Sequence, residues 1–351
     1  MSCHRVLHSG FPSRRRFLQG ATAALGGSMW SLTQATKSRA ASPASQSSCP
    51  PEVRAALSGP WPSFRTPFTR DGEIDQAALA RMLDFQIEQG KAKAVIVTPG
   101  DSLYSILTDD EIADLAKMVC RHVRNRAFVV IAGRELWTGK MVQFAGYCKQ
   151  IGADMVMAIP PDWPQSGTID TFVEYYKAVS EQIPIMFNSG YLGRRGTEFT
   201  LELVGRLCDE VPGVVAMKDD ISGNLTRRIC LRAHDHWALS AGGQKQNHMN
   251  MHPYGADGYL STFITFNPEI AWRYWAAIEQ GDLEAATGVI RDYDMPFFDY
   301  VIGVRGSFDA AMHGIYELMG LATRHRRPPY HALTDQQMEE LGDFLRRNKM
   351  L

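Results

Sequence analysis

The chain lacks an excess of either charge and has little cysteine. Its 351 residues include 37 Lys and Arg against 38 Asp and Glu, which gives a formal net charge of −1 at pH 7. Proteins that bind nucleic acid normally carry strongly basic surfaces, so this balance argues against nucleic acid as a partner. Six cysteines in a chain of this length do not make a disulfide framework. The 45% hydrophobic and 21% charged residues instead predict an ordinary globular protein with an ample core.

Motifs for phosphate-containing cofactors and for membrane anchoring are missing as well. No Gly-x-Gly-x-x-Gly follows the first expected strand, and no phosphate-binding Gly-Lys loop occurs. Their absence counts against a doubly wound nucleotide-binding fold. Beyond the N-terminal segment, no apolar run is long enough to span a bilayer.

The first 41 residues have the features of a targeting segment. Residues 13–19, Ser-Arg-Arg-Arg-Phe-Leu-Gln, resemble the twin-arginine export signature, and a weakly apolar stretch and small residues follow them. We therefore expect residues 1–41 to be a twin-arginine-type signal peptide and residues 42–56, rich in Ser, Pro and Ala, to be a linker. The mature protein is then expected in the periplasm or otherwise exported from a bacterial cell, with no membrane contact after removal of the signal.

From residue 61 onward, strand-like runs alternate with helical patterns. The strand candidates are residues 61–66, 94–98, 127–132, 154–159, 184–187, 214–217, 238–241 and 258–261. The clearest helix begins at Thr108, whose side chain can form a capping box with Glu111. Eight strand–helix units favour a parallel (β/α)8 TIM barrel over the alternative, a doubly wound sheet. We place the barrel at residues 57–281 and a C-terminal helical subdomain at residues 282–351.

Residues 214–220, Val-Val-Ala-Met-Lys-Asp-Asp, are the most informative stretch. Turn residues flank the apolar run, which favours a strand covered on both faces, as in a parallel sheet. Lys218 stands at the exit of this strand, where partial burial would favour the neutral amine that attacks a carbonyl group. Taken alone, a solvated lysine at a strand end explains the stretch more simply.

Several short motifs follow one another in order along residues 61–345. They are Thr-Pro-Phe at 66–68, Asp-Gly-Glu-Ile-Asp at 71–75, Thr-Pro-Gly-Asp-Ser at 98–102, Leu-Thr-Asp-Asp-Glu at 107–111, Phe-Asn at 187–188, Lys218, Gly-Ala-Asp-Gly at 255–258 and Arg-Pro-Pro at 327–329. In this order and spacing they resemble the dihydrodipicolinate synthase/N-acetylneuraminate lyase family of Schiff-base-forming aldolases. The resemblance implies a TIM barrel with a C-terminal helical subdomain and chemistry that requires neither a metal nor an organic cofactor. It also implies a homo-oligomer, either a dimer or a tetramer.

The resemblance assigns roles to individual residues. Lys218 takes the place of the lysine that condenses with the ketone of pyruvate or another 2-oxo acid, and barrel active sites lie at the carboxyl ends of the strands, where Lys218 is expected. Residues 98–102 match the loop that holds the carboxylate of the oxo acid. This match implies substrate-binding roles for Thr98, Gly100, Asp101 and Ser102. Asn188 is expected to order the end of the fifth strand, and Arg195, with Arg194 as the alternative, to meet the substrate carboxylate or the proton relay.

Departures from the family pattern bear on the chemistry. Pro99 has no N–H to donate to a carboxylate. Phe187 occupies the position of the tyrosine that moves protons beside the Schiff base, and phenylalanine has no ionisable group. The proton relay is therefore expected to be lost or replaced. The candidate replacements are Tyr104, Tyr191, Asp219, Asp220 and Tyr259. Asp162 and Trp163 stand where a family tyrosine reaches a neighbouring subunit, so the dimer contact is expected to differ.

The sequence thus predicts a lyase or aldolase that forms a Schiff base between Lys218 and a small carboxylated carbonyl substrate, for aldol cleavage, condensation or dehydration. Export and the missing tyrosines favour a substrate of the sugar-acid type over lysine biosynthesis. Two alternatives remain open: a catalytically silent barrel that binds a carboxylate or acts as a scaffold, and a metal-dependent barrel enzyme. The metal alternative depends on His248 and His252, which would lie on one face of a helix.

Overall fold

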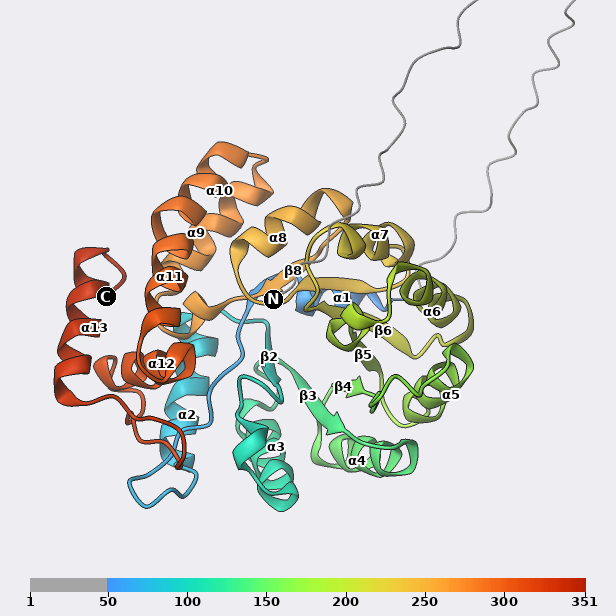
Figure 1. Ribbon diagram of the computed structural model, residues 1–351, viewed down its shortest axis with the longest axis horizontal. Coiled ribbons are helices and arrows are strands. Elements are labelled where there is room, and N and C mark those ends of the chain that lie inside the picture. Colours follow the sequence, from blue (N-terminus) through green and yellow to red (C-terminus); the bar gives the residue numbers. More distant parts are fainter. Residues whose placement is uncertain (1–48) are drawn as a thin grey trace, which may run out of the picture. The chain divides into compact units, whose positions relative to one another are not determined.

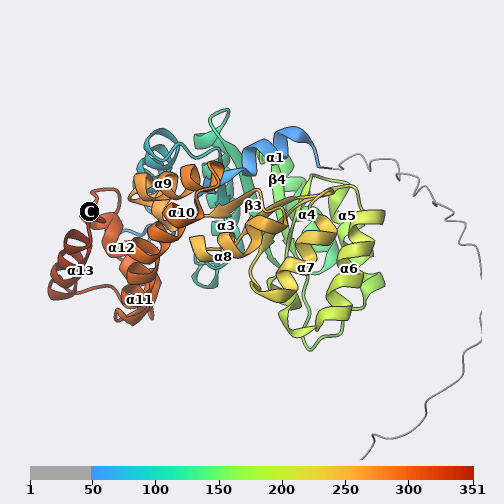
Figure 2. The same ribbon diagram turned by 90° about the horizontal axis from the view of Figure 1, so that it is seen from above.

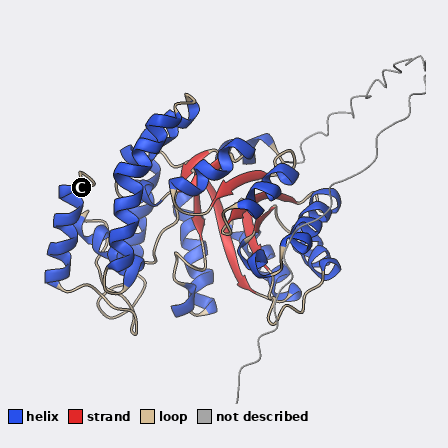
Figure 3. Ribbon diagram, turned by 45° about the horizontal axis from the view of Figure 1, so that its top comes forward, coloured by secondary structure: helices blue, strands red, loops and turns tan. Residues whose placement is uncertain are grey.

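Eight parallel strands form the centre of the structure, a computed structural model that describes residues 49–351. They are β1 (Gly59–Trp61), β2 (Ala94–Val97), β3 (Phe128–Glu135), β4 (Met155–Ile159), β5 (Ile185–Asn188), β6 (Val214–Asp219), β7 (Ala238–Ala241) and β8 (Gly258–Leu260). From β2 to β8, neighbours in the chain are neighbours in the sheet, and β8 pairs with β1. An isolated bridge between Ser63 and Ile96 joins the two ends of the sheet, so the strands form a nearly closed barrel (Figure 3). The predicted TIM barrel is confirmed.

Helices surround the strands, as Figure 1 shows. The helices around the barrel are α2 (Gln76–Asp84), α3 (Asp109–Val123), α4 (Thr138–Ile151), α5 (Ile169–Ser180), α6 (Thr197–Glu210), α7 (Asn224–Ala233), α8 (Lys245–Met251) and α9 (Pro268–Glu279). At the start of α3 the predicted capping box is present: the Glu111 N–H donates to the Thr108 hydroxyl, and the Thr108 N–H donates to the Glu111 carboxylate.

The predicted C-terminal helical region is also confirmed. It comprises α10 (Leu283–Val289), α11 (Met295–Gly303), α12 (Ser307–Leu318) and α13 (Asp335–Arg347). A π-helical turn over Ile290–Asp294 connects α10 to α11. These helices lie to one side of the barrel (Figures 1 and 2).

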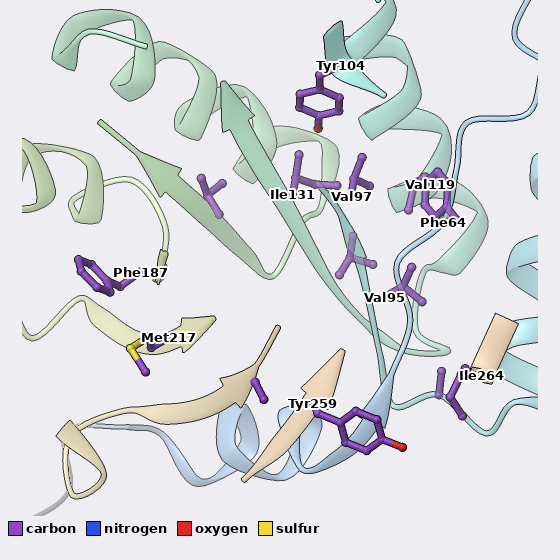
Figure 4. Close-up of a cluster of buried hydrophobic side chains, with 14 of the residues drawn as sticks. Phe64, Val95, Val97, Tyr104, Val119, Ile131, Phe187, Met217, Tyr259 and Ile264 are labelled. Atoms are coloured by element: carbon purple, nitrogen blue, oxygen red, sulfur yellow. The ribbon is translucent and has the colours of Figure 1, made fainter. Parts of the chain in front are cut away.

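The strands are buried on both faces, and their side chains belong to two apolar clusters. Ile96, Met186 and Ala216 belong to the cluster inside the barrel. Alternate side chains point outward and pack under the helices, and Figure 4 shows part of this outer cluster, including Phe187 and Met217. Because successive side chains of a strand point to opposite faces, the position of a residue along its strand decides whether it can reach the barrel interior.

The first strand lies earlier in the chain than predicted. We expected residues 61–66, but β1 is Gly59–Trp61. Proline has no N–H, so Pro62 cannot continue a regular ladder beyond Trp61. Past Trp61, the Pro62 carbonyl still accepts a hydrogen bond from the Ile96 N–H at 3.2 Å.

Part of the predicted linker is a helix instead. The expected signal peptide and the first part of the linker lie outside the described residues, but residues Pro51–Leu57 form α1, with a proline at the first helical position. Val53 and Leu57 are buried in the barrel cluster. Arg54 donates to both carboxylate oxygens of Asp257, at 2.8 and 2.7 Å. The helix therefore packs against the end of the barrel where the strands begin, although its Pro- and Ala-rich sequence is typical of a linker.

The cysteines within residues 49–351 are free, as the sequence predicts, and they are also buried. Burial raises the pKa of the Cys120 thiol to about 12, which keeps it protonated and unreactive. No helix in this range is both long and apolar enough to cross a membrane.

Candidate active site

Lys218 lies at the carboxyl end of β6 and faces a cavity of ≈ 340 Å³. The other residues that line the cavity are Ser63, Arg65, Asp101, Asp220, Gly242, Gly243, Gln244, Asn247, Leu260, Thr262, Phe298, Ile302 and Phe308. Phe298, Ile302 and Phe308 belong to α11 and α12, so the C-terminal helices contribute an apolar wall. Larger hollows of ≈ 740 and ≈ 570 Å³ lie elsewhere, and we place the site at the smaller cavity because Lys218 opens into it.

The Lys218 side chain is largely buried and is paired with a carboxylate. It is 9% exposed, and its Nζ donates a short hydrogen bond to Asp220 Oδ1. Asp220 itself is 37% exposed. β6 pairs with β5 and β7 so that Asn188 and Ser240 flank Lys218 in register. The amine is thus held at one place with one polar partner and an open side toward the cavity.

Asp220 is fixed from three directions. Asn188 Nδ2 donates to Asp220 Oδ2 at 2.6 Å, and the Asp220 N–H donates to Ser189 Oγ at 3.0 Å. The third contact is with Gly242, which follows β7. A Cβ at Gly242 would lie 2.2 Å from Asp220 Oδ1 and 2.3 Å from the Asp219 carbonyl oxygen, so only glycine leaves room for the carboxylate there. The carboxylate beside Lys218 is therefore held by β5, by the chain after β7 and by its own backbone.

Asp219, although adjacent, has a different role. Its Oδ1 accepts from Ser189 Oγ at 2.7 Å, and its Oδ2 accepts from the Ser222 N–H at 2.9 Å and from Thr226 Oγ1 at 3.0 Å. The side chain is buried, and all three donors belong to the protein. Asp219 therefore holds the turn between β6 and α7 and has no free oxygen for a substrate.

A buried arginine also belongs to the site, although the sequence analysis did not predict it. Arg65 is 1% exposed and follows β1. Its guanidinium donates to Asp101 Oδ1 at 3.0 Å and to Asp309 Oδ1 at 3.2 Å, and lies 4.4 Å from the centre of the Phe308 ring. Burial alone would raise the pKa of Asp101, but the Arg65 charge, a Ser63 hydroxyl and the Lys218 charge outweigh it and lower that pKa. Asp101 is consequently a carboxylate that stays ionised in a half-buried position.

Within the predicted carboxylate-binding loop, only part of the chain faces the cavity. Asp101 lines it. Thr98 Oγ1 accepts from the Asp101 N–H at 3.1 Å, and Ser102 Oγ accepts from the Thr98 N–H at 3.2 Å while donating to the Phe64 carbonyl at 3.1 Å. Both hydroxyls are therefore used to shape the loop. Gly100 lies between them in the turn and does not contribute to the cavity lining.

The position of Phe187 corrects an expectation. We expected this residue beside the amine, but its ring packs outside the barrel, with ring centroids 5.6 Å from Tyr176, 6.1 Å from Tyr191 and 5.5 Å from Trp237 (Figure 4). The reason is the strand period: Phe187 pairs in register with Met217, whereas Asn188 pairs with Lys218. Asn188 therefore occupies the place beside the amine on β5.

The three candidate tyrosines lie away from the amine. Tyr104 donates to the Ala132 carbonyl at 3.0 Å, and Tyr259 donates to the Ala271 carbonyl at 3.4 Å. Tyr191 shares a hydrogen bond with Tyr176 at 3.2 Å. Burial raises the pKa of Tyr104, Tyr191 and Tyr259, which disfavours the phenolate form that a relay would need.

Arg195 also lies away from the cavity. Its guanidinium donates to the Gln165 carbonyl at 2.7 Å and to the Gly167 carbonyl, and stacks 4.0 Å from the centre of the Phe199 ring. It holds the loop after β4 in place of meeting a substrate carboxylate. Arg194 lines the ≈ 570 Å³ hollow together with Trp163, whose side chain is 87% exposed.

Of the two histidines of the metal alternative, His248 is fully buried and His252 is half-buried beside it. His248 Nδ1 is hydrogen-bonded to Tyr274 Oη at 2.8 Å, and its ring lies 5.4 Å from that of His252. Burial, reinforced by His252, lowers the pKa of His248 to about 3. Among residues 49–351, no group of three or more His, Cys, Asp and Glu side chains is placed to hold a metal ion.

Comparison with known proteins agrees with this architecture. The model of the dihydrodipicolinate synthetase family matches residues 56–348. The chain belongs to this family. A relative in this family, a 4-hydroxy-tetrahydrodipicolinate synthase of Psychrobacter sp. (strain PRwf-1), is 27% identical over 243 residues, which cover 68% of this chain and 78% of the relative.

Other similar proteins have different names. A protein of Allorhizobium ampelinum named "Probable 5-dehydro-4-deoxyglucarate dehydratase" is 24% identical over 304 residues, covering 84% of this chain and 98% of the relative. The structure of YagE from Escherichia coli K12 in complex with pyruvate superposes with a TM-score of 0.71 at 21% identity, over 84% of this chain and 99% of YagE. N-acetylneuraminate lyase from Mycoplasma synoviae gives a TM-score of 0.71 at 19% identity, with the same coverage. At these identities the two structures show a shared fold.

Proposed function

We propose that this member of the dihydrodipicolinate synthetase family is a lyase that forms a Schiff base between Lys218 and a small 2-oxo acid or related carbonyl compound. The observation that carries the proposal is the environment of the Lys218 amine. It is largely buried at the carboxyl end of a barrel strand, is hydrogen-bonded to one carboxylate, and opens into a cavity of ≈ 340 Å³. A lysine in this setting can act as the nucleophile toward a carbonyl group.

The chemistry follows from the amine. Neutral Nζ adds to the ketone carbon, and the resulting carbinolamine loses water to give an iminium. The positively charged nitrogen then accepts electron density, so that a C–H or C–C bond at the carbon beside the former carbonyl can break. The enamine formed by loss of the C–H proton can then expel a hydroxyl group from the next carbon. Aldol cleavage, its reverse and dehydration all begin in this way, and none of these steps requires a metal or an organic cofactor.

The lining of the cavity favours a hydroxylated substrate of the sugar-acid type. Ser63, Asp101 and Asn247 line it, and hydroxyl, carboxylate and amide groups can bind the hydroxyl groups of a substrate. The apolar wall from α11 and α12 closes the other side. The similarity to a protein named as a 5-dehydro-4-deoxyglucarate dehydratase, across nearly all of that protein's length, supports the same class.

Reduction with borohydride tests the proposal. Treatment in the presence of pyruvate, or of another 2-oxo acid, should convert the iminium into a stable secondary amine and inactivate the protein. The Lys218→Ala variant should form no adduct while keeping its thermal stability. If neither pyruvate nor longer 2-oxo acids are trapped by the wild-type protein, the Schiff-base function is wrong.

A silent barrel that binds a carboxylated ligand is the second candidate. It is favoured by the missing phenol group at position 187 and by the places of Tyr104, Tyr191 and Tyr259, which lie away from the amine. Such a protein would show saturable binding of 2-oxo acids by calorimetry without borohydride trapping. The two outcomes separate the candidates.

We also propose that the protein is exported through its twin-arginine-type segment and assembles as a dimer or tetramer. The motif Ser-Arg-Arg-Arg-Phe-Leu-Gln at residues 13–19 supports the first proposal, and membership of the family supports the second. Replacing Arg14 and Arg15 together by lysine should retain the protein in the cytoplasmic fraction of the cell. Sedimentation of the mature protein then gives its mass, and a monomer would contradict the assembly.

A further inference from the structure

We propose that Asp220 is the proton-transfer group of this enzyme, a role that the Phe187 ring, packed outside the barrel, cannot fill. The inference rests on the proposed Schiff-base function. Asp220 lines the cavity, is 37% exposed, and accepts a hydrogen bond from the Lys218 amine. It is therefore a catalytic residue in the strict sense, because it touches the atom that reacts.

Hydrogen bonds and packing hold the Asp220 carboxylate in place for this role. Its Oδ2 is fixed by Asn188 Nδ2 at 2.6 Å, which leaves Oδ1 directed at Lys218 Nζ. The backbone of Asp220 is fixed by Ser189 Oγ at 3.0 Å. Gly242 leaves the space that the carboxylate fills. A proton-transfer group has to stay within hydrogen-bond reach of the atoms that exchange protons, and this arrangement keeps Asp220 there.

The other carboxylates near Lys218 are hydrogen-bonded to neighbouring protein groups. Asp101 is bound by Arg65 at 3.0 Å and by the Ser63 hydroxyl, and its lowered pKa makes it a poor proton donor. Both carboxylate oxygens of Asp219 accept hydrogen bonds from protein donors. Within residues 49–351, Asp220 is the carboxylate that both contacts the amine and has room on its cavity side.

The steps balance with Asp220 as the proton carrier. The carboxylate takes one proton from the Lys218 ammonium, and the neutral amine bonds to the ketone carbon. As the N–C bond forms, the amine proton moves to the former carbonyl oxygen, giving a carbinolamine. Protonated Asp220 then gives its proton to that hydroxyl, which leaves as water when the iminium forms. Asp220, again a carboxylate, next removes a proton from the carbon beside the iminium, and the electron pair of the C–H bond forms the enamine.

Asp219 provides a matched control. It is the preceding residue, carries the same functional group and is more deeply buried, but it contacts the turn between β6 and α7 instead of the cavity. Replacing each aspartate by asparagine removes one ionisable oxygen and keeps the size of the side chain. Asp219→Asn should therefore lower the melting temperature, whereas Asp220→Asn should act mainly on proton transfer.

The test uses the full mature protein with pyruvate as the probe. Exchange of the pyruvate methyl protons with deuterium oxide, followed by NMR, reports enamine formation. We expect Asp220→Asn to slow this exchange by about 10²- to 10⁴-fold, the usual contribution of a positioned general base. Borohydride should still trap the adduct at Lys218 after long incubation, because the amine remains. Asp220→Glu should restore part of the exchange, because it returns a carboxylate to the same position.

Two results would overturn the inference without touching the proposed function. One is exchange within about threefold of wild type in Asp220→Asn, since a lost general base costs far more. The other is an equal loss in Asp219→Asn at unchanged melting temperature. If the wild-type protein forms no adduct with pyruvate or longer 2-oxo acids, both the proposed function and the role of Asp220 are wrong.

Discussion

Lys218 and Lys245 each form an ion pair with an aspartate, but the two pairs lie in different surroundings. The Lys218 and Asp220 side chains are 9% and 37% exposed and face the cavity. The Lys245 and Asp294 side chains are 1% and 2% exposed, with Nζ and Oδ1 2.6 Å apart. Asp294 Oδ2 also accepts from the Lys245 N–H at 2.7 Å, and Nζ lies 3.9 Å from the centre of the Phe263 ring.

The difference between the pairs shows what turns a lysine into a site. At Lys245 every polar atom of the pair has a protein partner and no space remains for a ligand. Burial lowers the pKa of Lys245 although Asp294 acts in the opposite direction, but no substrate can reach the amine. At Lys218 the partner is itself partly exposed, so a carbonyl group can approach. Space beside the amine, more than the ion pair, distinguishes the two lysines.

The largest effect on stability is expected at the sealed pair. Lys245→Met leaves the Asp294 carboxylate buried without its cation, which should lower the free energy of unfolding by about 3–5 kcal/mol. Denaturant unfolding, monitored by circular dichroism, measures the loss. A change below about 1 kcal/mol, the range of exposed pairs, would show that Asp294 finds another partner or water.

A smaller effect on stability is expected at acidic pH, from a histidine near the same pair. His248 lies on α8 with Lys245 and is kept neutral, with a pKa of about 3 in the folded protein. In the unfolded chain its pKa is near the ordinary value of about 6.5. The unfolded state therefore binds the extra proton, and His248 stabilises the fold fully above pH 6.5 and progressively less as the pH falls toward 3. We expect roughly 1 kcal/mol of stability to be lost per pH unit in this range.

Replacing His248 by glutamine isolates this contribution. The variant removes the titrating group, so its unfolding free energy should fall less steeply between pH 6.5 and 4 than that of the wild-type protein. Equal slopes in both proteins would mean that His248 does not cause the loss.

The smallest effect on stability is expected at the open pair. Lys218→Met leaves Asp220 in contact with solvent and with Asn188, so the free energy of unfolding should change by less than about 1 kcal/mol. The same unfolding experiment serves both lysine variants. A loss at Lys218 as large as that at Lys245 would remove the distinction between them.

Much of the fold was predictable because the pattern along the chain is local. Apolar runs bounded by turn residues marked the strands, and Thr108 with Glu111 marked a helix start that the structure has at the same place. The exceptions depend on contacts distant in sequence. β1 is set by pairing with β8, and α1 is fixed by Arg54 reaching Asp257, about two hundred residues away. Composition alone does not reveal such contacts.

A site residue was predictable from the sequence only where the family motif also matches the face of the strand on which the side chain lies. Lys218 and Asp101 line one cavity, and Asn188 lies beside Lys218 at the end of β5. Phe187 does not lie there, because a shared motif gives no information about which face of β5 a side chain occupies. Arg65 was missed because its role depends on Asp309, a residue of α12 that becomes its neighbour only in the folded protein. An arginine within an apolar segment was the available signal.

Peptide mapping after reduction tests most directly whether Lys218 forms the Schiff base. The mature protein is incubated with pyruvate or another 2-oxo acid, treated with borohydride, digested and analysed by mass spectrometry for modified lysines. We expect one modified site, Lys218, and an unmodified Lys245. A reproducible adduct at any other lysine, or none at Lys218 under conditions where another site is trapped, would contradict it.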